Sequence, residues 1–259
     1  MNINVITIFP DMFKAITDWG ITARALKSGC YQLKLWNPRD YTQDVYRKVD
    51  DRPYGGGPGM VMQMGPLEKT LSAMAIHNQK SADKNSADTK PPVILLSPQG
   101  KNFCHQDAVK LASYPSFTLV CGRYEGIDQR FIDKHVDSEI NVGDFIVSGG
   151  ELPAMVVIDS IIRLLPNALN CPESSISESF ANGLLDFPHY TRPAVYNEQK
   201  VPSVLINGHH HLINKWRREQ SLQMTLKKRP DLLLKARQNG FLSQDDEFYL
   251  AQININHLN

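Results

Sequence analysis

Residues Phe117–Asp128 read FTLVCGRYEGID, an apolar run that passes directly into a loop with two glycines. Short apolar runs such as Phe117–Cys121, bounded by Pro and Gly, are typical of buried strands in parallel sheets. Two other glycine-bearing segments are also predicted to be loops that follow a strand, namely Leu95–Gly100 (LLSPQG) and Asn141–Pro153 (NVGDFIVSGGELP). In an open α/β sheet, ligands bind beyond the carboxyl ends of the strands. We therefore predict that these three loops form one pocket.

Backbone amides and carbonyls would make up most of the polar lining of this pocket. Such a lining suits an adenine ring, which needs donors, acceptors and apolar walls rather than charge. The loops also contain four ionisable side chains, each of which could instead be a solvated or salt-bridged loop charge: Arg123, Glu125, Asp144 and Glu151.

Predicted strands and helices alternate through the first two thirds of the chain. Strands are expected over Asn2–Phe9, Tyr31–Trp36, Val93–Leu96 and Phe117–Cys121. One helix is expected to begin at Pro10 and a second to end at about Ser28, and further helices are expected over Leu67–His77, Ile127–His135 and Leu152–Arg163. This alternation predicts an α/β domain with a mainly parallel sheet over residues 1–169.

Three further stretches complete the predicted organisation. Asn78–Pro92 is polar and free of aromatic residues, which favours a surface loop. Residues 170–179 (NCPESSISES) have the composition of a flexible linker. Residues 180–259 lack strand alternation, so we expect a small, mainly helical domain.

The overall charge of the chain is close to neutral, but the charge is unevenly distributed. The 259 residues include 28 Lys and Arg against 27 Asp and Glu, a net charge of +1, and 42% of residues are hydrophobic. This composition excludes a disordered chain, a fibrous repeat and a small disulfide scaffold. Lys215–Arg237, however, has eight basic and two acidic residues, +6 net, which leaves −5 for the remainder. Such a cluster is typical of a phosphate-binding face, although charge runs are also common on solvated helices.

Several absences point to a soluble, cytoplasmic protein. The opening MNINVITIFP lacks the basic and apolar regions of a signal peptide. No apolar run approaches the roughly 20 residues that span a bilayer. The four cysteines are scattered, without zinc spacing, which favours free thiols in a reducing compartment.

Asp50–Met60 (DDRPYGGGPGM) is the stretch richest in glycine. Four glycines and two prolines in eleven residues exclude a helix or a central strand. Such a loop lets another molecule approach the backbone, and its N–H groups can bind anions. It matches neither the P-loop nor the dinucleotide-binding pattern. A tight turn without a ligand remains the alternative.

Gly183–Pro193 (GLLDFPHYTRP) combines Asp186, His189, Tyr190 and Arg192 with helix breakers, a composition that often contacts ligands. Three adjacent histidines at 209–211 cannot all face one ion, so we expect no metal there.

Five of these motifs, in this order and spacing, resemble the bacterial tRNA (guanine-N1)-methyltransferase family: DDRPYGGGPGM, LLSPQG, VCGRYEGID, GDFIVSGGELPA and LLDFPHYTRP. The resemblance implies a SPOUT-type α/β domain with a trefoil knot, a flexible linker and a C-terminal helical domain. It also implies a homodimer with a composite active site. The implied reaction transfers a methyl group from S-adenosylmethionine to N1 of the guanine immediately 3′ of the tRNA anticodon, which supports reading-frame maintenance. Magnesium is compatible with the resemblance, although no ligand cluster in the sequence requires it.

The resemblance also assigns residues to roles. One wall of the methyl-donor site matches Leu96, Ser97, Pro98, Gly122, Tyr124 and Glu125. The other wall matches Val142, Gly143, Asp144, Phe145, Ile146, Val147, Gly149, Gly150 and Pro153. The glycine-rich loop, with Asp50, Arg52, Gly55 and Gly59, matches the segment that approaches the target guanine in the family. Asp186, His189 and Arg192 match residues that lie near the target base and the RNA in the family. Because Arg217 and Arg218 belong to the basic segment, we expect them to contact the tRNA backbone.

The chain departs from the family pattern at the expected general base. Where the family carries an aspartate before Ser-Phe, this chain has Glu178 before Ser179. A carboxylate there would accept the N1 proton, while Arg163 would stabilise negative charge on the purine. Two smaller departures, Val142 for isoleucine and Phe145 for tyrosine, preserve the apolar wall.

Two alternatives stay open at this point. One is a related methyltransferase that acts on another RNA position or on a ribose 2′-OH. The other is a catalytically silent RNA-binding protein of the same fold, for which the aspartate-to-glutamate change is the best support.

Overall fold

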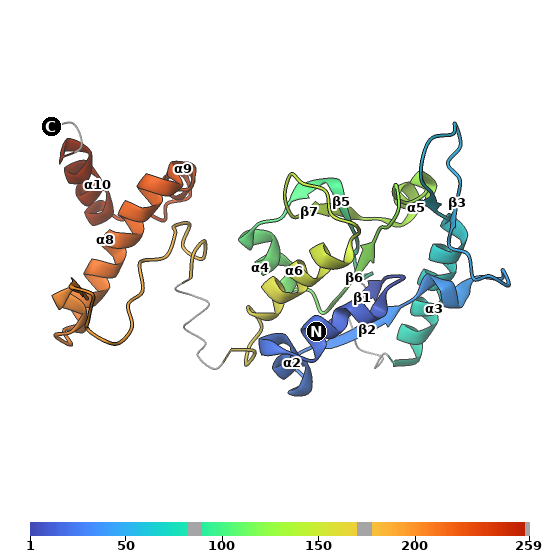
Figure 1. Ribbon diagram of the computed structural model, residues 1–259, viewed down its shortest axis with the longest axis horizontal. Coiled ribbons are helices and arrows are strands. Elements are labelled where there is room, and N and C mark those ends of the chain that lie inside the picture. The colour runs from blue at the N-terminus through green and yellow to red at the C-terminus, as the bar shows by residue number, and fades with distance from the viewer. Residues whose placement is uncertain (82–89, 170–177, 257–259) are drawn as a thin grey trace. The chain divides into compact units, whose positions relative to one another are not determined.

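The computed structural model describes residues 1–81, 90–169 and 178–256, and the chain divides into two compact units, Met1–Asn170 and Cys171–Asn259 (Figure 1). Most of the predicted linker, residues 170–177, lies outside the described residues. Each unit is built around its own hydrophobic core.

The first unit is organised by a five-stranded sheet in which every pairing is parallel. The strand order is β2-β1-β6-β5-β7, with β1 at Asn2–Ile6, β2 at Gln32–Trp36, β5 at Val93–Asn102, β6 at Ser116–Cys121 and β7 at Ser138–Asn141. The predicted mainly parallel α/β fold is confirmed. The trefoil knot that the resemblance implies stays a prediction, because strand order does not specify how the chain threads.

Helices cover both faces of this sheet (Figure 1). Successive residues of a strand point to opposite faces, so Ile94 and Leu96 of β5 pack in one cluster and Val93 and Leu95 in the other. The first cluster includes residues of α2 (Gly20–Lys27), α4 (His105–Ala112) and α6 (Glu151–Ile162). The second includes residues of α3 (Met64–Ser81) and α5 (Gln129–His135).

Short elements connect these layers. They are the 3₁₀ helices η1 (Pro10–Phe13) and η2 (Pro38–Tyr41), helix α1 (Lys14–Thr17), and an antiparallel pair of two-residue strands, β3 (Asp50–Asp51) and β4 (Val61–Met62). Gly29 follows the C-cap of α2 with a φ of +76°, which confirms the predicted stop.

One loop boundary was predicted wrongly. The polar stretch that begins at Asn78 was expected to be a loop, but α3 continues to Ser81. Residues 78–81 include the good helix formers Gln79 and Lys80, so the helix extends beyond its apolar pattern. Residues 82–89 lie outside the described part of the chain.

The second unit is mainly helical, as predicted. It contains α8 (His210–Lys228), α9 (Pro230–Gln238) and α10 (Gln244–Asn256), preceded by the 3₁₀ helix η3 (Ser203–Leu205). Its core is formed by Leu184, Leu222, Leu233, Ala236 and Leu250. Pro230 occupies the first position of α9, where the missing N–H of proline removes no helical hydrogen bond.

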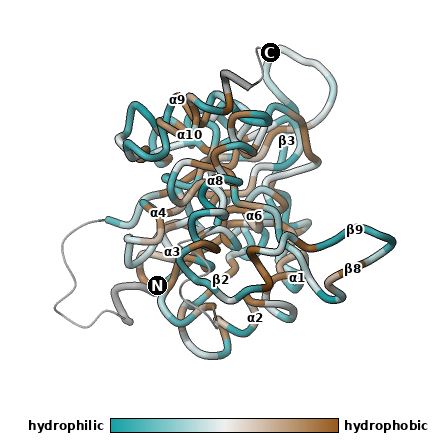
Figure 2. The backbone as a smooth tube through the Cα atoms, turned by 90° about the vertical axis from the view of Figure 1, so that its left-hand side faces the viewer, coloured by the Kyte–Doolittle hydropathy of each residue, from teal (hydrophilic) through white to brown (hydrophobic). Residues whose placement is uncertain are grey.

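The second unit also contains a small hairpin that the sequence analysis did not expect. Strands β8 (Val195–Tyr196) and β9 (Gln199–Lys200) pair antiparallel, and both are labelled on the tube in Figure 2. Asn197 and Glu198 turn the chain with φ values of +47° and +66°. Two-residue strands are too short to show alternation, so no sequence pattern marked them.

No helix in the described ranges combines the length and the apolar composition that a membrane span needs.

Candidate active site

The three glycine-bearing segments belong to three neighbouring strands or follow them. Leu96 of β5 is in register with Cys121 of β6 on one side and with Ile140 of β7 on the other. Cys121 ends β6 and Ile140 lies one residue before the end of β7, so the second and third predicted loops begin on either side of β5. The first predicted loop, Leu95–Gly100, was predicted wrongly, because β5 continues through it to Asn102. Between Leu96 and Lys101 the register of β5 with β7 shifts, so that Ser97 and Pro98 bulge from the sheet.

Glycine at position 150 allows two of the loops to touch. The Gly150 N–H donates to the Gly122 carbonyl at 2.9 Å. A Cβ added at Gly150 would lie 2.7 Å from the Cα of Cys121, closer than real Cβ atoms approach. Any other residue here would therefore push the start of α6 away from the end of β6.

An ion pair also joins the loop after β6 to the start of α6. The Arg123 guanidinium donates from Nε to Glu151 Oε2 at 2.7 Å and from Nη1 to the Ser148 carbonyl at 3.0 Å. Glu151 is completely buried, and its second carboxylate oxygen accepts from the Thr7 hydroxyl at 2.8 Å. The pair thus ties the loop after β6 to the loop before α6 and to the end of β1.

Two further contacts hold the Arg123 side chain in place. Its guanidinium carbon lies 4.5 Å from the centre of the Phe9 ring, a cation–π contact, and Nη2 lies 3.2 Å from the sulfur of Met12. Burial raises the pKa of the neighbouring Cys121 thiol well above its ordinary value, and the nearby Glu151 carboxylate raises it further. The thiol therefore remains protonated.

The glycine-rich loop lies against the loop that follows β6. The Glu125 N–H donates to the Met60 carbonyl at 3.0 Å, and the Met62 N–H donates to the Gly126 carbonyl at 2.9 Å. A Cβ on Gly59 would lie 2.4 Å from the Glu125 carboxylate, so this glycine allows the two loops to meet.

The same contact brings Asp50 to Tyr124. Burial raises the pKa of the Tyr124 phenol, and the Asp50 carboxylate adds to the shift, while Arg39 opposes it. Tyr124 itself has a φ of +62°, which is uncommon for a residue other than glycine. Arg52 and Gly55 are exposed on the same glycine-rich loop.

The loop after β7 presents apolar side chains to the surface. Asn141 shapes its start, because the Asn141 side-chain oxygen accepts from the Gly143 N–H at 3.0 Å and its amide nitrogen lies 3.4 Å from Asp144. Phe145 and Ile146 are 59% and 80% exposed, although both are large and apolar. Val142 and Val147 are half-buried, and Pro153 is buried in the first turn of α6.

Arg163 lies at the other end of α6 from the glycine-bearing loops. It caps the C-terminal end of α6, whereas Glu151 begins the helix at the loops. Twelve residues at 1.5 Å each separate the two by about 18 Å along the helix axis. Arg163 and Glu178 each have an interaction partner within the structure.

In the second unit, the predicted RNA-contacting segment folds against α8. Asp186 pairs with His189 at 3.0 Å, and the ring of His189 lies 4.7 Å from that of Phe187. The Arg217 guanidinium lies 4.9 Å above the Phe187 ring. Asp186, His189 and Arg217 therefore form one cluster around Phe187.

Glu178 begins the segment that holds this cluster. The hydroxyl of the next residue, Ser179, accepts from the Asp186 N–H at 2.9 Å. The Glu178 carbonyl accepts from the Ala181 N–H at 3.3 Å, and Glu178 is half-buried. These bonds fix the backbone beside Glu178 relative to Asp186.

Arg218, predicted beside Arg217 as a tRNA contact, points into its own unit instead. Its guanidinium donates to both oxygens of Asp246 at 3.0 and 2.9 Å and to the Phe241 carbonyl at 2.9 Å. Asp246 is only 6% exposed. Neighbouring residues on a helix face different directions, so Arg218 connects α8 to the start of α10 while Arg217 faces Phe187. Arg192 is exposed and precedes Pro193.

Sequence reasoning missed several contributors to these clusters, among them Thr7 and Phe9, which follow β1, as well as Met12, Arg39 and Phe187. Thr7 and Phe9 could have been found, because β1 ends at the same sheet edge as the three loops. Within residues 1–81, 90–169 and 178–256, no group of three or more His, Cys, Asp or Glu side chains is placed to hold a metal ion.

Comparisons with known proteins agree with this arrangement. A family model described as "tRNA (Guanine-1)-methyltransferase TrmD" matches residues 1–235. A curated tRNA (guanine-N(1)-)-methyltransferase of Cupriavidus metallidurans is 53% identical over 98% of this chain and 95% of its own length. Proteins of the same name from Burkholderia cenocepacia and Ralstonia nicotianae are 54% and 53% identical over 96% and 97% of this chain, in each case 93% of the relative. This chain therefore belongs to the tRNA (guanine-N1)-methyltransferase family.

Proposed function

We propose that the protein transfers a methyl group from S-adenosylmethionine to N1 of the guanosine immediately 3′ of the tRNA anticodon. The observation that carries the proposal is that three glycine-bearing segments lie on or directly after three neighbouring strands, in a chain of this family. The glycine-rich loop proposed to approach the guanine lies directly against the proposed donor loops.

The residues present at the loops fit the methyl donor. Gly150 and Gly122 keep the loops close, and backbone groups form much of the polar surface that an adenine ring needs. Phe145 and Ile146 offer exposed apolar surface on the neighbouring loop. When bound, the donor supplies an electrophilic methyl group on its sulfonium. The remaining task of the protein is to align the acceptor nitrogen.

Two side chains would make the acceptor reactive. Guanine N1 carries a proton at neutral pH, and the Glu178 carboxylate would accept it as N1 attacks the methyl carbon. The negative charge that develops on O6 would be stabilised by the Arg163 guanidinium. Glutamate performs the same chemistry as aspartate, and its additional methylene shifts the carboxylate outward.

A second copy of the chain would complete this active site. Leu152 and Val156 on α6 are 47% and 52% exposed, although both are apolar. Arg163 lies eleven residues after Leu152, which returns it to the same face of the helix at 3.6 residues per turn. A dimer that covers this apolar stripe would carry Arg163 toward the partner subunit, which agrees with the distance between Arg163 and its own donor loops.

The second unit would bind the tRNA. Arg217, Lys227 and Lys228 are exposed on α8 and provide cations for the phosphate backbone. Affinity of this kind falls steeply with salt and carries little sequence information. Recognition of the guanine must then come from the edges of an unstacked base, the common mode for RNA loops. We place the protein in the cytoplasm, which agrees with the free thiols of Cys30, Cys104 and Cys121.

Identification of the methylated nucleoside tests the proposed reaction. The full chain is incubated with a methyl-labelled donor and unmodified tRNA, with and without magnesium, and the digested RNA is analysed by mass spectrometry. We expect N1-methylguanosine, and we expect a rate 10²–10⁴-fold lower for Glu178→Gln, with Glu178→Asp retaining the reaction. A 2′-O-methylated nucleoside would disprove the assignment, and so would the absence of product.

A further inference from the structure

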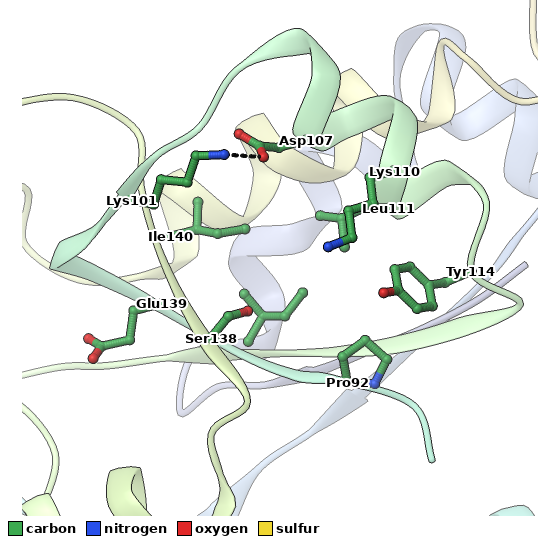
Figure 3. Close-up of a pocket in the computed structure, with 10 residues that line it drawn as sticks. Pro92, Lys101, Asp107, Lys110, Leu111, Tyr114, Ser138, Glu139 and Ile140 are labelled. Carbon is green, nitrogen blue, oxygen red and sulfur yellow. Dashed lines mark hydrogen bonds and ion pairs between the residues drawn. The ribbon is translucent and has the colours of Figure 1, made fainter. Parts of the chain in front are cut away.

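A cavity of about 220 Å³ opens between helix α4 and strands β5 and β7 (Figure 3). It shares no residue with the proposed donor loops or with the cluster around Asp186. Its walls come from three elements and their flanking residues, namely Pro92, Ile94, Lys101, Asp107, Lys110, Leu111, Tyr114, Ser138, Glu139 and Ile140.

The helical wall of the cavity is one face of α4 and its continuation. Asp107, Lys110, Leu111 and Tyr114 follow the spacing that places side chains on the same side of a helix. Leu111 is buried and packs on the sheet, while Lys110 is exposed and Tyr114 is half-buried. The face therefore combines an apolar anchor with polar groups at the rim.

The floor of the cavity is apolar. Ile94, Leu111 and Ile140 retain only 2%, 6% and 8% of their exposure, so their side chains are fixed by the core. A ligand that rests on this floor gains from covering the remaining apolar surface. A small inorganic anion would leave that surface in contact with water.

Among the described charged side chains that line the cavity, only one cation is not neutralised by an ion pair. Lys101 forms an ion pair with Asp107 at 2.7 Å, and this pair is neutral as a unit. Glu139 directs its carboxylate away from the cavity, whereas Lys110 Nζ and the Tyr114 hydroxyl point toward it (Figure 3). Among the described residues, neither the ammonium of Lys110 nor the hydroxyl of Tyr114 has a hydrogen-bond or ion-pair partner.

We propose that this cavity binds a small organic carboxylate with an apolar body. The carboxylate would accept from the Lys110 ammonium and the Tyr114 hydroxyl, with the Ser138 hydroxyl on the opposite wall. Charge-assisted bonds of this kind are stronger than neutral ones. The apolar body would lie on Ile94, Leu111 and Ile140. Pockets for drug-sized ligands measure about 300–1,000 Å³, so this cavity selects a single-ring or short branched acid.

Three probes that differ in charge or in apolar surface test this proposal on the full chain. Benzoate carries both the charge and the apolar ring, benzamide lacks the charge, and inorganic phosphate lacks the ring. Ligand-observed NMR should give a Kd for benzoate of about 1 mM, since so small a ligand makes few contacts. We expect benzamide and phosphate to bind at least about tenfold more weakly, because each lacks one of the two interactions.

Two substitutions locate the binding. Lys110→Gln removes the cation, and Tyr114→Phe removes only the hydroxyl; both should weaken benzoate binding, the first by about tenfold. Lys27→Gln, an exposed lysine in the last turn of α2, is the matched control and should bind benzoate like the wild type. Circular dichroism confirms that each variant is folded.

Three results would overturn the proposal. They are equal affinity for benzoate and benzamide, benzoate affinity unchanged by Lys110→Gln, and no benzoate binding to the folded wild type. Methyl transfer plays no part in these measurements, so they succeed or fail independently of the proposed reaction.

Discussion

Arg123 and Glu151 form a 2.7 Å ion pair whose carboxylate is completely buried, and the pair connects the loop after β6 to the first residue of α6. The first prediction concerns the stability of this connection. Arg123→Met leaves the Glu151 charge buried without its partner, which should lower the free energy of unfolding by about 3 kcal/mol. The double variant Arg123→Met/Glu151→Gln removes that charge and keeps an acceptor for Thr7, so it should be more stable than Arg123→Met alone. Urea denaturation measures both, and equal stability of the two variants would contradict this account.

The second prediction concerns the close contact at Gly150. Gly150→Ala places a Cβ 2.7 Å from the Cα of Cys121, so the proposed donor loops must separate. Overpacking of this kind costs roughly 1–3 kcal/mol, and we expect calorimetry to show weaker binding of S-adenosylmethionine. Gly65→Ala is the matched control: it lies in helix α3 with open space around its Cβ position. Because no atom lies within 4 Å of that Cβ position, this control should leave donor affinity unchanged. Unchanged donor affinity in Gly150→Ala would remove the contact from the proposed donor site.

The third prediction concerns the reactivity of the cysteines. Burial, with the nearby Glu151 carboxylate, keeps the pKa of Cys121 well above its ordinary value of 9.0, although Arg123 acts in the opposite direction. Alkylation requires the thiolate, so Cys121 should resist iodoacetamide at pH 8 in the folded protein, while the exposed Cys104 reacts. Peptide mass spectrometry before and after addition of urea distinguishes the two. Cys121 should become reactive only on unfolding, and rapid alkylation of Cys121 in the native state would count against its buried position.

The sequence predicted the sheet well because the strands that decide it are buried on both faces. Val93–Leu96 and Phe117–Cys121 are short runs of mostly apolar residues, which are typical of strands buried on both faces. The hairpin at Val195–Lys200 was missed because two residues per strand carry no periodic signal, and it depends on two left-handed residues in its turn. Local pattern thus predicts long, buried elements better than short, exposed ones.

Within the candidate site, the motifs selected segments that lie close together, but they did not predict the directions of individual side chains. Motif order selected Gly122, Gly150 and Asp50, whose segments the structure brings together. Helical periodicity alone predicts that Arg217 and Arg218 point in different directions. The sequence could not show which of them faces Phe187 and which pairs with Asp246 of α10, because that depends on tertiary packing. The pairing of Arg123 with Glu151 was likewise one of several open interpretations until α6 was positioned against β6.

The fourth prediction separates the two arginines of α8. Arg217→Ala removes an exposed cation above Phe187, so tRNA affinity should fall and its dependence on log salt should decrease by about one unit of slope. Arg218→Ala should instead leave Asp246 buried and unpaired, lowering the stability of the second unit by roughly 2 kcal/mol. Filter binding over a salt series measures the first effect, and chemical denaturation measures the second. A loss of stability in Arg217→Ala, or none in Arg218→Ala, would reverse the two roles.

The fifth prediction tests whether the active site is shared between subunits. Arg163 lies about 18 Å along α6 from Glu151, by helical rise alone, so it is proposed to serve the donor loops of a partner. Arg163→Ala and Gly150→Ala chains should each transfer methyl groups slowly as homodimers. When the two are co-expressed with different affinity tags and mixed dimers are purified, one of the two sites in each dimer contains neither substitution. Such dimers should recover about half of the wild-type rate, because a two-fold dimer has two equivalent sites. If Arg163 served its own chain, every site in the mixed dimer would carry one substitution, and purification of that dimer would restore nothing beyond the average of the two parent proteins.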